Sequence, residues 1–157
     1  RVSDRSIGSM EGRLTVRSDL ELLNIRFPRN LYQTGCLNVL FDSGCAVSKA
    51  AHGVAVSVLA GSTRSIIKCS LAQAADYFTL GEILGTGGAN SGVIRSVRDY
   101  VPGELRLSFP LPKTPTVGDA FTVWPGCDGR QSTCSGKYNN LARYRAFPYI
   151  PTPETAV

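Results

Sequence analysis

Apolar and polar residues alternate in short runs along this chain. In the run 104–109, Leu105, Leu107 and Phe109 fall on one face, and polar residues fall on the other. This alternation is typical of an antiparallel strand with one buried face. The same kind of pattern predicts six more strands, at Gly12–Arg17, Leu20–Ile25, Val54–Leu59, Ser65–Leu71, Val93–Tyr100 and Ala120–Trp124.

The spacing of these runs predicts a mainly β fold, a small antiparallel barrel or sandwich with long loops and little helix. Helical patterns are confined to Ser48–His52 and Leu71–Phe78. The glycine-rich stretch Gly85–Gly92 lacks the G-x-G-x-x-G spacing, and no lysine follows it as in a P-loop. We therefore expect a turn between two strands there.

The length of 157 residues suits one domain with a core of its own. We expect a single β-rich domain over residues 1–147. Residues 148–157 contain three prolines and little to bury, which predicts an extended tail. No apolar run approaches the roughly 20 residues of a membrane-spanning helix.

The chain carries a net charge of +5, but its basic residues are scattered. No stripe of aromatic residues lies between them, so the pattern predicts a solvated basic surface and no sequence-specific binding of nucleic acid. The sequence leaves open whether the basic surface contacts passing DNA or an acidic surface.

Four of the five cysteines form two pairs, Cys36 with Cys45 in a C-x8-C motif and Cys127 with Cys134 in a C-x6-C motif. This arrangement suggests one site with four thiolates, and three chemistries compete for it. Disulfides need an oxidising compartment, and no secretory signal is visible in a sequence that begins at Arg1. Structural zinc normally uses C-x2–4-C motifs. Loops of this length can reach an iron–sulfur cluster, which the chemistry favours while leaving zinc open.

Other residues near this site have simpler interpretations. Cys69 shares a strand face with Ile67 and Leu71, so we expect it in the core. Phe121 and Trp124 are expected to shield the thiolates from water. Glycines beside the paired cysteines could let backbone amides approach the sulfurs, or could be ordinary turn residues. These glycines are Gly35, Gly44, Gly126 and Gly129.

Nothing in the sequence indicates an enzyme. His52 is the single histidine, and no G-x-S-x-G elbow presents a serine. We expect a surface or packing role for this histidine. The carboxylates are dispersed, so no pair of them stands out as an acid and a base.

The segment Phe121–Pro148 resembles a signature of phage tail-tip proteins. It contains Pro-Gly-Cys127-Asp, then Cys134, then Lys137-Tyr-Asn-Asn and Arg145-Ala-Phe-Pro148, similar to the family's PGCD, C, KFxN and NFRGFP. The likeness extends over roughly residues 31–151, including Tyr77–Gly81 and Gly87–Gly92. Tyr138 and Ala146 depart from the pattern, and so does 142–144, where Ala-Arg-Tyr replaces Asn-Phe.

Proteins of that family belong to the tail tip or baseplate hub of long-tailed phages and gene transfer agents. The paired motifs are also similar to the C-terminal region of the minor tail protein of lambda-like phages, where four cysteines hold a [4Fe–4S] cluster. The resemblance implies that this cluster is bound here, with Cys69 outside the site. The implied ligands are Cys36, Cys45, Cys127 and Cys134.

The resemblance further implies a non-enzymatic structural component of the virion, assembled in the bacterial cytoplasm and rigidified by the cluster. The implied partners are a distal tail ring and a central fibre or spike protein, with the chain forming a homotrimer around the tail axis. The alternative is a redox-responsive iron–sulfur or zinc-binding protein that switches conformation during infection.

Overall fold

The computed structural model describes residues 2–7, 11–16 and 32–149. Contacts divide the chain into two compact units, Arg1–Tyr32 and Gln33–Val157, which are described separately. The assignment of residues 1–147 to a single domain stays a prediction. The predicted strand Leu20–Ile25 lies outside the described residues, as does most of the predicted tail.

The first unit contains an antiparallel hairpin of β1 (Val2–Ile7) and β2 (Gly12–Val16). Ile7 pairs with Gly12 beside the turn. β2 confirms the predicted strand at residues 12–17, whereas β1 was not predicted. Its sequence has four consecutive polar residues between Val2 and Ile7, so it lacks the alternation that reveals a half-buried strand.

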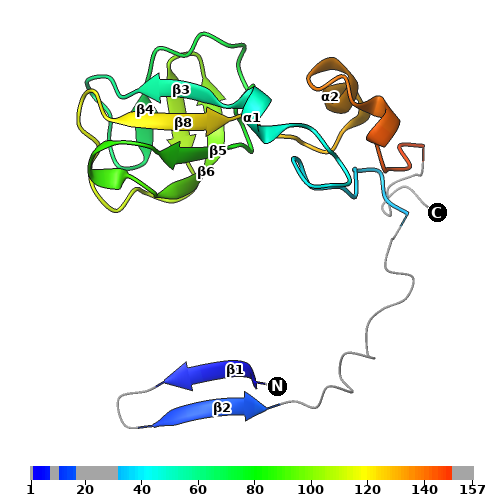
Figure 1. The fold of residues 1–157 in the computed structure, drawn as a ribbon, viewed down its shortest axis with the longest axis horizontal. Helices are drawn as coiled ribbons and strands as arrows, with labels where there is room; N and C mark the ends of the chain where they lie inside the picture. Colours follow the sequence, from blue (N-terminus) through cyan, green and yellow to red (C-terminus); the bar gives the residue numbers. More distant parts are fainter. Residues whose placement is uncertain (1, 8–10, 17–31, 150–157) are drawn as a thin grey trace, which may run out of the picture. The chain divides into compact units, whose positions relative to one another are not determined.

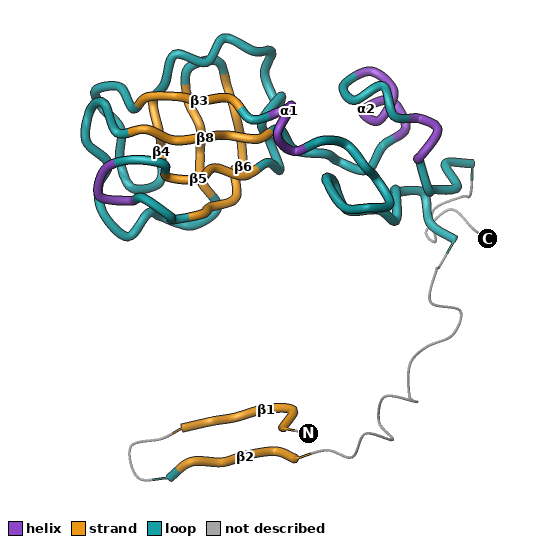
Figure 2. The backbone as a smooth tube through the Cα atoms, in the orientation of Figure 1, coloured by secondary structure: helices purple, strands orange, loops and turns teal. Residues whose placement is uncertain are grey.

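The second unit is built on a six-stranded antiparallel sheet in the order β3-β8-β5-β6-β7-β4. The sheet curls into a half-barrel (Figures 1 and 2). Beyond the strands, the N–H of Leu59 donates to the carbonyl of Lys68 at 2.8 Å and links the two outer strands. The mainly β prediction is confirmed. The strands are β3 (Val54–Ser57), β4 (Ile66–Lys68), β5 (Glu82–Gly85), β6 (Ile94–Val101), β7 (Glu104–Leu107) and β8 (Ala120–Trp124).

Helices are short in the described part of the chain. α1 (Lys49–His52) falls within the predicted 48–52 segment. The predicted helix at 71–78 is wrong, because Asp76 has a positive φ of 64° and the segment forms turns around the buried Phe78. The remaining helices are α2 (Gln131–Gly136) and two 3₁₀ turns, η2 (Gly88–Asn90) and η3 (Leu141–Arg143). No helix of the described residues has the length and apolar character needed to cross a membrane.

Alternation along the strands fills the core of the half-barrel. Leu105 and Leu107 are buried as predicted, and so is Cys69, at 3% exposure. Phe109 is an exception at 70% exposure, because β7 ends at Leu107 and the chain leaves the sheet. The core residues are Val56, Val58, Ile67, Cys69, Leu71, Phe78, Ile83, Val97, Tyr100, Leu105, Leu107, Leu111, Phe121 and Val123.

Two long connections meet at the end of the half-barrel that lies away from α1 (Figure 1). The predicted turn at 85–92 is confirmed, since it joins β5 to β6 and contains η2. Asn90, which has no exposed surface, donates from Nδ2 to the carbonyl of Lys113 at 3.0 Å and accepts the Lys113 N–H at 3.1 Å. A single buried amide therefore anchors the connection between β7 and β8.

Replacing Asn90 with Ala should lower the free energy of unfolding by about 1–3 kcal/mol, because both polar groups of the Lys113 backbone lose a buried partner. Urea denaturation would measure the loss. Ser91→Ala, at an exposed neighbouring position, is the matched control and should change stability by less than about 0.5 kcal/mol. Equal losses in the two variants would contradict the anchoring role of Asn90.

Candidate functional site

All four paired cysteines line one small pocket beside the half-barrel. Two segments from opposite ends of the second unit, 33–48 and 127–149, surround this pocket and lie next to each other (Figure 1). We call these two segments the cysteine lobe. The structure therefore brings together the residues that the sequence pairs. The pocket is lined by Cys36, Asn38, Leu40, Cys45, Cys127, Gly129, Arg130, Cys134, Tyr138, Asn140, Arg143 and Tyr144.

Backbone hydrogen bonds join the two segments of the lobe. The N–H of Cys36 donates to the carbonyl of Gly129, and the N–H of Leu37 donates to the carbonyl of Arg145, each at 2.9 Å. These bonds place the C-x8-C loop directly against the C-x6-C loop, although the two are far apart in the sequence.

The C-x8-C loop is organised by Asp42. Its carboxylate accepts hydrogen bonds from the N–H groups of Cys45, at 2.5 Å, and Val39, at 2.8 Å. These two bonds, the Cys45 bond first, hold the pKa of Asp42 below its ordinary value. This role was not predicted from the sequence, where its only signal is an aspartate inside the loop.

Two glycines shape the C-x6-C loop. A side chain on Gly126 would place its Cβ 2.0 Å from the carbonyl oxygen of Thr79, so only glycine permits this close approach to the half-barrel. Gly129 has a φ of +74°, and its N–H donates to the Cys127 Sγ at 3.4 Å. The predicted approach of a glycine amide to a sulfur is thus found at Gly129. At Gly35, by contrast, an added Cβ would meet nothing within 4 Å.

Further polar groups contact the other sulfurs. The backbone N–H of Arg145 donates to the Cys36 Sγ at 3.4 Å, and Asn140 Nδ2 lies 3.6 Å from the Cys45 Sγ. The Cys134 thiol donates to the carbonyl of Asn140 at 3.3 Å. N–H donors favour the thiolate form of cysteine and are typical of thiolate-bound metal sites.

The close grouping of the thiols affects their acidity. Burial raises the pKa of Cys127 and of Cys134, and the neighbouring cysteines raise both pKa values further. Four thiolates in this pocket would repel each other at short range, which is unfavourable unless a positively charged group lies among them. A bound metal would offset this repulsion, because it replaces the protons of the thiols with positive charge.

The donor set fits a thiolate-bound metal group. None of the five cysteines is paired in a disulfide. Within the described residues, no group of three or more His, Cys, Asp or Glu side chains is arranged to hold a metal ion. Four cysteines around one pocket suit zinc or an iron–sulfur cluster by their chemistry.

The aromatic residues at the pocket differ from those predicted. Phe121 is buried in the half-barrel core, and Trp124 donates from Nε1 to the carbonyl of Lys49 at 3.0 Å. Neither lines the cysteine pocket, because the alternation of β8 directs Phe121 inward, while α1 engages Trp124. Tyr138 and Tyr144 line the pocket instead.

His52 lies near the pocket but packs against other rings. Its ring centroid is 5.4 Å from that of Tyr138 in an edge-on contact and 6.4 Å from that of Phe41. This agrees with the packing role expected from the sequence. No nucleophile among the described residues is hydrogen-bonded to His52 in the structure.

Lys137 carries a partly buried positive charge between the lobe and the half-barrel. Its ammonium donates to the carbonyls of Tyr77 and Gly126, the latter at 2.8 Å, and lies 4.5 Å from the Tyr77 ring centroid. Burial lowers the pKa of Lys137, and the nearby Cys127 and Asp128 oppose this shift. Among the described residues, no carboxylate forms an ion pair with it.

The lowered pKa of Asp42 predicts acid sensitivity of the C-x8-C loop. A carboxylate whose folded pKa is depressed contributes stability above its unfolded pKa, and this contribution is lost as the pH falls through the folded value. Amide hydrogen exchange at Val39 and Cys45 should therefore become less protected below the ordinary aspartate pKa of 3.8. Asp42→Asn should weaken protection at neutral pH and abolish this pH dependence. An unchanged pH profile in the variant would contradict the assignment.

Comparison with known proteins places this geometry in context. A search of curated proteins finds no match to the chain. Among solved structures, the chain matches one from the "Virion of native gene transfer agent (GTA) particle", with a TM-score of 0.69 and 25% sequence identity. The match covers 99% of this chain and 56% of that virion chain, so this chain spans little more than half the length of its structural relative.

A family model also matches residues 76–154, half of the chain. The matched region contains Cys127 and Cys134 together with Lys137 and Asn140, but it begins after the C-x8-C loop. The chain belongs to the family described as "Phage conserved hypothetical protein BR0599".

Proposed function

We propose that this chain is a structural component of a phage-type virion, located at the tail tip as part of the baseplate hub. Its membership of a phage family and its likeness to a chain of a gene transfer agent virion support a virion role. The resemblance of its motifs to tail-tip proteins supports the finer placement. The proposed role is mechanical and non-enzymatic.

We further propose that Cys36, Cys45, Cys127 and Cys134 hold a [4Fe–4S] cluster. The observation that carries this proposal is the near absence of a core in the cysteine lobe, where Cys134 is the one buried residue among 33–48 and 127–149. Segments with so little buried apolar surface usually need a metal or a covalent bridge to stay folded. When bound, a cluster supplies four iron–sulfur bonds that join the two loops.

The hydrogen bonds around the sulfurs support a metal site over disulfides. N–H groups of Gly129, Arg145 and Asn140 contact three of the sulfurs. They stabilise negative charge on sulfur, which a disulfide does not carry. The motif lengths favour a cluster over one zinc ion, since structural zinc normally uses shorter C-x2–4-C motifs.

The position of Lys137 is compatible with an anionic centre, alongside the nearby carboxylate of Asp128, which also favours its positive charge. A partly buried cation is costly unless a negative charge compensates it. The pocket beside it is neutral when it contains protonated thiols or disulfides, whereas a centre bound by four thiolates is anionic. Lys137 therefore fits a negatively charged occupant of the cysteine pocket.

Such a site would serve a part that must keep its shape outside the cell. Ligands from both ends of the second unit couple metal binding to closure of the lobe. Assembly in the bacterial cytoplasm, where thiols stay reduced, would allow the metal to bind before release. The proposed partners are other virion proteins, including a distal tail ring and a central fibre or spike protein. The chain itself would form a homotrimer around the tail axis.

The cluster can be tested on protein purified without oxygen. It should be brown and contain about four irons per chain, as expected for a cubane cluster. Replacing Cys36 or Cys127 with Ser should remove most of the iron and lower the melting temperature. A colourless protein with one zinc per chain would overturn the cluster assignment.

Cys69→Ser is the matched control, because Cys69 lies in the half-barrel core and outside the pocket. This variant should keep its full iron content. Its free energy of unfolding should fall by only about 1–3 kcal/mol, the cost of burying a hydroxyl. Loss of iron in this variant would show that the four-ligand assignment is wrong.

Removing the charge of Lys137 should loosen the bound metal. We expect Lys137→Met to release iron to a chelator about tenfold more readily, in the range seen when groups that support metal ligands are changed. Lys137→Arg, which keeps the charge, should retain more iron than Lys137→Met. Lys113→Met, at an exposed lysine on the far end of the half-barrel, is the control. Equal iron release from Lys137→Met and Lys113→Met would contradict the role of Lys137.

A further inference from the structure

The end of the half-barrel that faces away from the cysteine lobe exposes several large apolar side chains. Connections at 58–65, 86–93 and 108–119 meet there (Figure 1). We call this surface the distal end. A scattered exposed apolar residue needs no explanation, but four on or beside the meeting loops of one end do. They are Leu59 at 45% exposure, Ile94 at 55%, Phe109 at 70% and Val117 at 69%.

The loop that carries Phe109 and Val117 is held in place by side chains from neighbouring segments. Arg64 donates from Nε to the carbonyl of Leu111 at 2.6 Å, and Arg95 donates from Nε to the carbonyl of Pro110 at 3.1 Å. Asn90 holds Lys113 by two further bonds.

The same loop contains prolines at 110, 112 and 115, which restrict its backbone further. Its exposed Phe109 is thus presented on a prearranged support. Prearranged aromatic residues are effective anchors in protein interfaces, because little conformational entropy is lost when they bind.

Basic residues outnumber acidic ones at and beside this end. The connections 58–65, 86–93 and 108–119 contain Arg64, Lys113 and Asp119, and the adjoining strand residues add Arg95, Arg98 and Arg106 together with Asp99 and Glu104. Asp119 is buried, and its carboxylate accepts hydrogen bonds from Thr116, so it does little to neutralise the surface. Asp99 and Glu104 both form ion pairs with Arg106.

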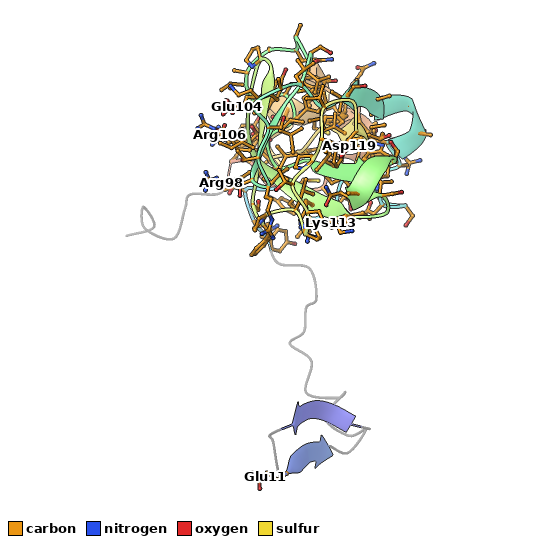
Figure 3. The ribbon with its side chains drawn as sticks, turned by 90° about the vertical axis from the view of Figure 1, so that its left-hand side faces the viewer. Glu11, Arg98, Glu104, Arg106, Lys113 and Asp119 are labelled. Carbon is orange, nitrogen blue, oxygen red and sulfur yellow. The ribbon has the colours of Figure 1, made fainter. Side chains whose placement is uncertain are left out.

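Some of this charge is paired, and some is available to a partner. Figure 3 looks onto the distal end and shows Arg98 and Arg106 on the same side of the half-barrel, next to Glu104. Arg106 contacts Glu104 at 2.8 Å and Asp99 at 3.5 Å. Within the described residues, no ion pair involves Arg64, Arg95, Arg98 or Lys113.

We propose that the distal end docks a different protein subunit, whose contact face has an apolar centre surrounded by carboxylates. This inference rests on the proposed role in a virion. Complementary charge favours an acidic partner and disfavours a second copy of the same basic face. The exposed Phe109, Val117 and Ile94 favour a protein over nucleic acid, which offers phosphates but few apolar surfaces.

Photo-cross-linking in assembled particles can identify the occupant. A photoreactive phenylalanine analogue at position 109 should link, after irradiation, to an acidic segment of another virion protein, identified by mass spectrometry. The same analogue at Leu141, an exposed position of the cysteine lobe, should not link to that segment. A link from position 109 to a second copy of this chain or to DNA, or no link at all, would overturn the proposal.

Substitutions provide an independent measure in the same particles. Phe109→Ser and Arg98→Glu should each lower the number of chains retained per particle about tenfold, as expected for removal of a central interface contact. Val39→Ser, at an exposed position of the cysteine lobe, should leave retention unchanged. The melting temperature of each purified variant should match that of the unaltered protein, since all three side chains are exposed.

The outcomes separate this proposal from the virion role itself. If the unaltered chain is absent from purified particles, the proposed function fails, and the docking surface fails with it. If the chain is present but Phe109→Ser and Arg98→Glu are retained as well as Val39→Ser, only the docking surface is overturned.

Discussion

The cysteine lobe depends on polar and sulfur contacts, because it has almost no apolar core. Among residues 33–48 and 127–149, only Cys134 is buried, whereas the adjoining half-barrel buries a continuous set of strand residues. Backbone bonds such as Cys36 to Gly129 and Leu37 to Arg145 bring the segments together. Each such bond contributes little net stability, about 0.5–1.5 kcal/mol, so a set of stronger links at the sulfurs would have a large effect on the lobe.

The half-barrel supports this lobe through a few close contacts. Gly126 passes so near the Thr79 backbone that no side chain fits between them, and this fixes the start of the C-x6-C loop. Lys137 reaches across to the carbonyl of Tyr77. On the other side, Lys49 of α1 accepts a hydrogen bond from Trp124 at the end of β8. The rigid sheet thus positions both loops, while the lobe itself contributes the sulfur ligands.

The two ends of the second unit differ in a way that suits a part of a larger assembly. One end carries the thiol pocket, in which contacts are internal and nearly all polar. The opposite end presents the exposed Phe109 and Val117 on a loop that Asn90 anchors. A protein whose function is to hold neighbours in fixed positions needs both internal rigidity and an external contact face.

By itself, the sequence determined the strands with clear alternation, including β8 at its observed bounds and most of β6 and β7. It also determined the core position of Cys69 and the pairing of four cysteines, because strand periodicity and motif spacing are local properties. Only the tertiary structure decided which residues surround the sulfurs. The local sequence does not reveal the hydrogen bonds of Asp42, Asn140 and Lys137. Trp124 contacts α1 and does not line the pocket. The exposure of Phe109 also depended on the tertiary structure. Alternation predicts which side chains share the buried face of a strand, but not the residue at which the chain leaves the sheet.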